Sequence, residues 1–91
     1  MTIADVLAKG RQIWPEEMTL GDIAVALTVV TGDVARGARG AKKDREEDIA
    51  KELGNLIASA VRWCDDLGLD PERCVELAFA AQQKYREEEN E

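Results

Sequence analysis

The stretch Asp44–Leu69, DREEDIAKELGNLIASAVRWCDDLGL, decides how this chain of 91 residues folds. Its apolar residues recur every three or four positions, which places them on one face of an α-helix. They are Ile49, Leu53, Leu56, Ile57, Ala60, Val61, Cys64 and Leu67. A second row, Asp48, Glu52, Asn55 and Ser59, follows the border between this face and the polar side. We therefore predict one long helix whose border row carries the polar chemistry.

Two helices are predicted before the long one. Capping-box patterns, Thr-x-x-Asp, predict helices over residues 2–14 and 20–36. The second of these is apolar on two sides, with Val25 and Val29 set apart from its other apolar residues. A helix of this kind is expected to be buried on both sides, which indicates contact with another subunit.

The long helix and the segment after it carry boundary signals. The pattern Asp44-x-x-Glu47 predicts an N-cap at Asp44, and Gly68 predicts the C-terminal end of the helix. Asp70 followed by Pro71 predicts the start of a fourth helix. No strand pattern occurs. The chain is therefore predicted to be all-α, with four helices in a bundle.

Length and composition limit the core that one chain can form. We expect a single helical domain over residues 1–86, followed by an acidic, fraying tail over residues 87–91. A chain this short buries only about 60–65% of the surface that its unfolded form exposes. Because its aromatic content is also only 4%, we expect a homodimer or a larger homo-oligomer.

Charge and residue types exclude several classes of function. The net charge of −7 argues against a nucleic-acid polymer as partner, because such binders concentrate positive charge. The absence of histidine excludes Ser–His and Cys–His catalysis and most zinc sites. The sequence has no signal-peptide pattern and no apolar run near the ~20 residues of a membrane span. We expect a cytoplasmic protein without a membrane partner, with its two cysteines reduced.

Positive charge is concentrated in one short segment. Five basic residues fall within ten positions: Arg36, Arg39, Lys42, Lys43 and Arg45. Two interpretations stay open for them. They form either a solvated basic loop or a site for the phosphates of a small ligand.

Two parts of the chain, read together, carry a family resemblance. Ala50–Ile57, AKELGNLI, is followed by Trp63–Pro71, WCDDLGLDP, and Val29–Arg36 reads VVTGDVAR. Residues 19–86 thereby resemble the MazG-like all-α nucleoside triphosphate pyrophosphohydrolases. The resemblance implies a helical bundle that pairs into dimers or tetramers. It also implies that acids on the second and third helices hold Mg²⁺ on a nucleotide, from which water releases pyrophosphate.

The chain departs from that family at the metal ligands. Val29 and Val30 stand where the family has paired glutamates, and Asn55 stands where it has an aspartate. Valine supplies no ligand and asparagine only a neutral oxygen, so affinity for Mg²⁺ is expected to fall. The remaining candidate ligands are Asp33, Asp48 and Glu52.

Three hypotheses follow for the function. The leading one is a non-catalytic MazG-like protein that binds or sequesters a nucleotide or nucleotide-derived signal between helices. Its candidate ligand-binding residues are Arg36, Arg39, Lys42, Lys43, Arg45 and Asn55. The first alternative is a Mg²⁺-dependent nucleoside triphosphate pyrophosphohydrolase that uses the three remaining carboxylates. The second is a structural or protein-interaction oligomer without ligand, expected if Val29 and Val30 fill the space between the helices.

Overall fold

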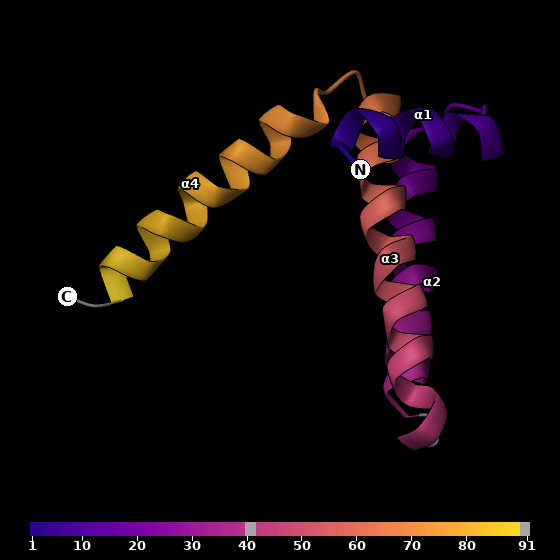
Figure 1. Cartoon of the computed structure of the whole chain (residues 1–91). Helices are drawn as coiled ribbons and strands as arrows, with labels where there is room; N and C mark the ends of the chain where they lie inside the picture. The colour runs from indigo at the N-terminus through magenta and orange to yellow at the C-terminus, as the bar shows by residue number, and fades with distance from the viewer. Residues whose placement is uncertain (40–41, 90–91) are drawn as a thin grey trace.

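The computed structural model describes residues 1–39 and 42–89, except for the side chains of residues 42–45 and 47. This part of the chain forms four α-helices and no strand (Figure 1), so the all-α prediction is confirmed. The helices are α1 (Ile3–Ile13), α2 (Leu20–Ala38), α3 (Lys42–Asp66) and α4 (Pro71–Glu89). Each helix in the described segments is too short or too polar to cross a lipid bilayer.

Capping boxes start the first two helices where the sequence predicts them. The Thr2 hydroxyl accepts a hydrogen bond from the Asp5 N–H at 3.1 Å, and the Asp5 carboxylate accepts one from the Thr2 N–H at 2.9 Å. Thr19 and Asp22 repeat this arrangement at 3.2 and 3.4 Å. These bonds satisfy N–H groups that a helix leaves without partners in its first turn.

Helix boundaries differ from the sequence-based prediction in several places. Helix α2 ends at Ala38, two residues beyond the predicted end. Helix α3 begins at Lys42, so Asp44 lies inside its first turn and is not the N-cap. Aspartate is favourable both at an N-cap and in a first turn, and the pattern alone does not separate these positions. Helix α4 continues through Glu89, into the segment 87–91 for which fraying is predicted. Residues 90 and 91 lie outside the described part of the chain.

A well-defined turn joins α3 to α4. Gly68 has a positive φ of 73°, which glycine adopts without steric cost. The N–H groups of Gly68 and Leu69 donate to the carbonyls of Asp65 at 2.9 Å and Cys64 at 2.8 Å, which is a Schellman motif. The Asp70 carboxylate then accepts a hydrogen bond from the first turn of α4. Together these bonds set the direction in which α4 leaves α3.

Helix α3 is the centre of the arrangement and contacts each of the other helices. Helix α2 lies alongside α3, α1 crosses near its C-terminal end, and α4 projects away from it (Figure 1). Three helices of one chain therefore pack together while the fourth diverges. The four-helix bundle predicted from the sequence is not closed within a single chain, because the turn at Gly68 directs α4 outward.

The buried core of one chain is small. Its apolar members are Ile23, Val30, Val61 and Trp63. On α3 the most buried polar residues are Ser59 and Asp66, at 4% and 5% exposure. In the border row, Asp48 and Glu52 are half-buried and Asn55 is exposed. The predicted apolar face is partly open instead: Leu53, Ile57 and Leu67 are 43%, 64% and 40% exposed. On α2, Val25 and Val29 also lie on the surface of the chain.

Ion pairs fasten α1 to the C-terminal end of α3. The Arg11 guanidinium donates hydrogen bonds to Asp65 at 2.7 and 3.2 Å and to Asp66. The Asp66 side chain is fully buried, and its second oxygen has no hydrogen-bond partner in the described structure. The hydrogen bonds to Asp65 and Asp66 raise the pKa of Arg11. Burial of a carboxylate without a cation close by is energetically costly. Arg11 lowers this cost for Asp66 by pairing with its carboxylate.

We predict that Arg11→Ala lowers the free energy of unfolding by about 2 kcal/mol, less than for a fully buried pair because Arg11 is partly exposed. Urea unfolding at one fixed protein concentration measures this loss. The matched control is Arg73→Ala, which removes an exposed pair with Glu76 on α4. Its expected change is below about 0.5 kcal/mol. Equal losses in the two variants would contradict the assignment.

Candidate functional site

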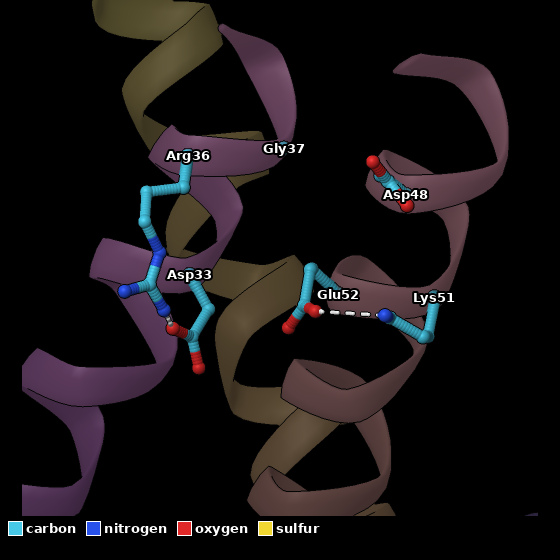
Figure 2. Close-up of a pocket in the computed structure, with 6 residues that line it drawn as sticks. All are labelled: Asp33, Arg36, Gly37, Asp48, Lys51 and Glu52. Atoms are coloured by element: carbon cyan, nitrogen blue, oxygen red, sulfur yellow. Dashed lines mark ion pairs between the residues drawn. The ribbon is translucent and has the colours of Figure 1, made fainter. Parts of the chain in front are cut away.

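A polar hollow of about 200 Å³ lies between the C-terminal half of α2 and the N-terminal half of α3 (Figure 2). Its lining residues are Asp33, Arg36 and Gly37 from α2 and Asp48, Lys51 and Glu52 from α3. We call this the acidic hollow. All three carboxylates predicted as metal ligands thus line one space, and they reach it from both helices.

Each basic side chain of the acidic hollow is paired with a carboxylate. Arg36 pairs with Asp33 one turn earlier on α2, and Lys51 pairs with Glu52 at 3.6 Å. The carboxylates are the more buried partners, whereas Arg36 and Lys51 are 77% and 71% exposed. The acids therefore form the floor of the hollow and the bases form its rim.

Helix α2 approaches α3 closely at Gly37. A Cβ atom built on Gly37 would meet the backbone of Asp48 and Ile49 at 3.5 Å, which is ordinary van der Waals contact. There is room for one methyl group but not for a long side chain. Gly37 therefore sets the spacing of the two helices at one end of the acidic hollow.

A second hollow, of about 380 Å³, opens between α2 and α3 further along the pair. Its lining residues are Trp14, Ala26, Val29, Val30, Asn55, Ser59, Arg62 and Trp63. We call this the tryptophan hollow. No carboxylate among the described residues lines it. Asn55 belongs to this hollow and not to the acidic one, so the predicted site residues are divided between two spaces.

The polar groups of the tryptophan hollow are arranged around aromatic rings. The Ser59 hydroxyl donates to the Asn55 amide oxygen at 3.5 Å. The Arg62 guanidinium lies 5.8 Å from the ring centroid of Trp14, within range of a cation–π contact. The Trp63 Nε1–H is buried and has no hydrogen-bond partner in the described structure. Such a set can stack on a flat ring and hydrogen-bond to its edge.

The two hollows adjoin along the same pair of helices. Val30 and Asp33 are three residues apart on α2, and Glu52 and Asn55 are three residues apart on α3. One helical turn, about 5 Å, therefore separates their linings. We refer to the two hollows together as the α2–α3 groove.

The two valines fill only part of the space between the helices. Val30 is buried in the core with Ile23 and Trp63, whereas Val29 is exposed at the edge of the tryptophan hollow. The hollow therefore stays open beside both residues. A structural protein without ligand stays a hypothesis.

Not all of the predicted basic residues line the groove. Arg36 is at the rim of the acidic hollow, whereas Arg39 is the exposed C-cap residue of α2 and lines neither hollow. The side chains of Lys42, Lys43 and Arg45 lie outside the described residues. Their contribution to ligand binding stays a prediction.

The three carboxylates share a hollow but are not grouped as metal ligands. Among the described side chains, no three acidic or cysteine groups lie close enough together to hold one metal ion. Mg²⁺ needs oxygen ligands in near-octahedral geometry at about 2.1 Å. The acidic hollow in this arrangement does not fit that requirement.

No protein-family model, curated protein or solved structure compared with this chain matches it. The resemblance to MazG-like proteins stays an expectation from the sequence. The fold and the groove are therefore the basis for assigning a function.

Sequence reasoning missed several residues that line the groove. Lys51 and Gly37 were not among the predicted site residues, although Lys51 precedes Glu52 and Gly37 follows Arg36. Arg62 continues the polar border row of α3 beyond Ser59, so its spacing is an available signal. Trp14 reaches the groove from the segment after α1, and no local pattern indicates that contact.

We predict that Gly37→Ala changes the free energy of unfolding by less than about 1 kcal/mol, because a methyl group fits and alanine favours a helix. In contrast, Gly37→Leu should lower it by about 1–3 kcal/mol, because the added atoms force α2 and α3 apart. Thermal or urea unfolding measures both changes. Gly32→Leu is the control, since nothing lies within 4 Å of a Cβ at Gly32. A loss in the control as large as at Gly37 would contradict the role of close helix packing.

Proposed function

We propose that this chain is a MazG-like helical protein that binds a nucleotide or nucleotide-derived signal in the α2–α3 groove without hydrolysing it. One observation carries the proposal: a hollow lined by tryptophan, asparagine and serine adjoins a hollow with basic side chains at its rim. A nucleotide matches these two hollows, because it has a flat base at one end and negatively charged phosphates at the other.

The tryptophan hollow supports binding of the base. Its volume of about 380 Å³ falls within the 300–1,000 Å³ usual for small-molecule sites. Trp14 and Arg62 offer flat surfaces for stacking, which is worth about 1–3 kcal/mol per base. Asn55 and Ser59 supply an amide and a hydroxyl that can donate to and accept from the edge of a base.

The rim of the acidic hollow supports binding of the phosphates. Arg36 and Lys51 each form an ion pair with a carboxylate, and most of each basic side chain stays exposed to solvent. A guanidinium can donate to a carboxylate and to a phosphate together, because it carries five N–H donors. Phosphates at the rim are also kept away from the acids of the floor, which lowers like-charge repulsion.

The distribution of acids supports binding over hydrolysis. The family that the sequence resembles uses paired glutamates at the positions of Val29 and Val30, and these valines line a hollow without described carboxylates. The remaining acids are not grouped for a metal in the described arrangement. A bound phosphate would therefore lack the cation that offsets charge during its hydrolysis.

We predict that isothermal titration calorimetry without divalent metal detects binding of a nucleotide with a dissociation constant below about 1 mM, which corresponds to about −4 kcal/mol. The probes are AMP, ATP, GTP and a cyclic dinucleotide. Asn55→Ala and Arg36→Ala should each weaken binding about tenfold, since each removes a hydrogen bond worth about 1.4 kcal/mol. Absence of binding heat for all probes at millimolar concentration would refute the proposal.

The control for these variants is Arg73→Ala on α4. Arg73 is exposed, pairs with Glu76 and lines neither hollow of the groove. It carries the same charge as Arg36, so its removal changes the net charge equally. An equal loss of affinity in both arginine variants would indicate attraction by overall charge and not a site at the groove.

A second candidate is a Mg²⁺-dependent nucleoside triphosphate pyrophosphohydrolase. The specific observation in its favour is that Asp33, Asp48 and Glu52 line one hollow from two facing helices. It predicts release of pyrophosphate from a nucleoside triphosphate when Mg²⁺ or Mn²⁺ is present. Glu52→Gln should abolish that release, whereas Glu46→Gln, at an exposed position of the same helix, should preserve it. Turnover with this dependence would replace the non-catalytic proposal.

A further inference from the structure

The face of α3 that carries its apolar seam is only partly covered by the rest of the chain. The seam consists of Leu53, Ile57, Ala60, Cys64 and Leu67, spaced alternately by four and three residues. It is centred roughly 130° around the helix from the border row that faces α2. The alternating spacing is that of a helix surface which interlocks with another helix. The open seam therefore has the pattern of a packing surface without its partner helix.

Helix α4 also carries an uncovered apolar surface. Cys74, Ala78, Ala81 and Tyr85 are again spaced by four and three residues. None of the residues of α4 is buried, and Phe79 is 65% exposed. A helix without a buried residue gains little stability from tertiary contacts, which normally supply most of a helix's stability. Helix α4 therefore has the same need for a partner as the seam on α3.

An apolar groove of about 370 Å³ lies between these two surfaces. Ile57, Ala60 and Cys64 line it from α3, and Cys74, Val75 and Ala78 line it from α4. Both cysteines in it are free thiols. Burial, with a smaller contribution from the neighbouring Cys74 thiol, raises the pKa of Cys64 to about 11. We call this space the α3–α4 groove.

The chain exposes far more surface than a self-sufficient monomer. A folded monomer of 10.0 kDa exposes about 5,200 Å², whereas this chain exposes 7061 Å². Its radius of gyration is 15.3 Å, against about 12 Å for a compact domain of 91 residues. The excess area of about 1,800 Å² is within the range that one subunit buries in an obligate dimer. A second copy of this chain could therefore cover the excess exposed area of the first.

We propose that a second copy of this chain inserts its α4 into the α3–α4 groove, and that the first copy does the same in return. Each chain carries both the groove and the helix that fits it. A two-fold axis between two copies therefore buries both grooves and both α4 helices at the same time. The matching spacing of the seam on α3 and the stripe on α4 allows their side chains to interlock. The helices α3 and α4 of the two copies then form one four-helix unit. This assembly is independent of the α2–α3 groove, which lies on another face of α3.

The test is sedimentation equilibrium of the full chain over a range of concentrations. The wild type should sediment at twice the 10.0 kDa mass of one chain. Ile57→Lys and Ala78→Glu should each raise the dissociation constant of the dimer about a hundredfold, because each places a charge in the apolar groove. Val25→Lys is the control, since Val25 is an exposed apolar residue on α2, outside the groove. A wild type that is monomeric at every concentration would overturn the proposal.

The location of the interface is tested by the same variants. A dimer or larger oligomer that survives Ile57→Lys and dissociates with Val25→Lys would move the interface to α2 and overturn the proposed one. Circular dichroism establishes whether each variant stays helical.

A measurement on the wild type avoids variants that fail to fold. The two native thiols line the groove, so insertion of a second α4 should slow their reaction with N-ethylmaleimide. At fixed reagent concentration and pH, the rate constant should fall as protein concentration rises through the dissociation constant. A rate constant independent of protein concentration over the range in which the mass doubles would overturn the assignment of the groove.

Discussion

The close packing of α2 along α3 is the constraint on which the other features of this protein depend. It is possible because Gly37 brings the helices together at one end, while Val30 and Trp63 form the core between them. The contact places the border row of α3 beside α2, where its amide, hydroxyl and carboxylate groups line two hollows. It also leaves the apolar seam of α3 facing away from α2. The packing of α2 against α3 thus creates both a polar groove and an exposed apolar surface.

The sequence predicts the local structure of this protein better than its packing. Helix starts follow from bonds between neighbours, as at Thr2 and Thr19, and such bonds can be recognised from spacing. The number of helices and the turn at Gly68 follow in the same way. The direction of α4 does not, because it depends on the backbone geometry of a few turn residues. A strongly apolar helix face indicates that a partner exists, but it does not indicate whether the partner belongs to the same chain.

The candidate site shows a similar division between what spacing reveals and what it does not. Asp48 and Glu52 lie one turn apart, and their shared hollow with Asp33 follows from two helices packed side by side. The separation of Asn55 from these acids was not predicted, because a small shift of one helix along another changes which residues meet. Trp14 enters the groove through tertiary contact alone. The chemistry of the tryptophan hollow is therefore visible only in the three-dimensional structure.

The small core of the single chain has a consequence for the protein in the cell. Burial of a few apolar side chains balances little of the conformational entropy of a 91-residue chain, so its folded state is expected to draw stability from association. In the proposed dimer, folding stability depends on how many copies are present. At low abundance a larger share of the chains is open to proteases, and at high abundance the chains protect one another. Synthesis rate would thereby set not only the amount of the protein but also how long each copy survives.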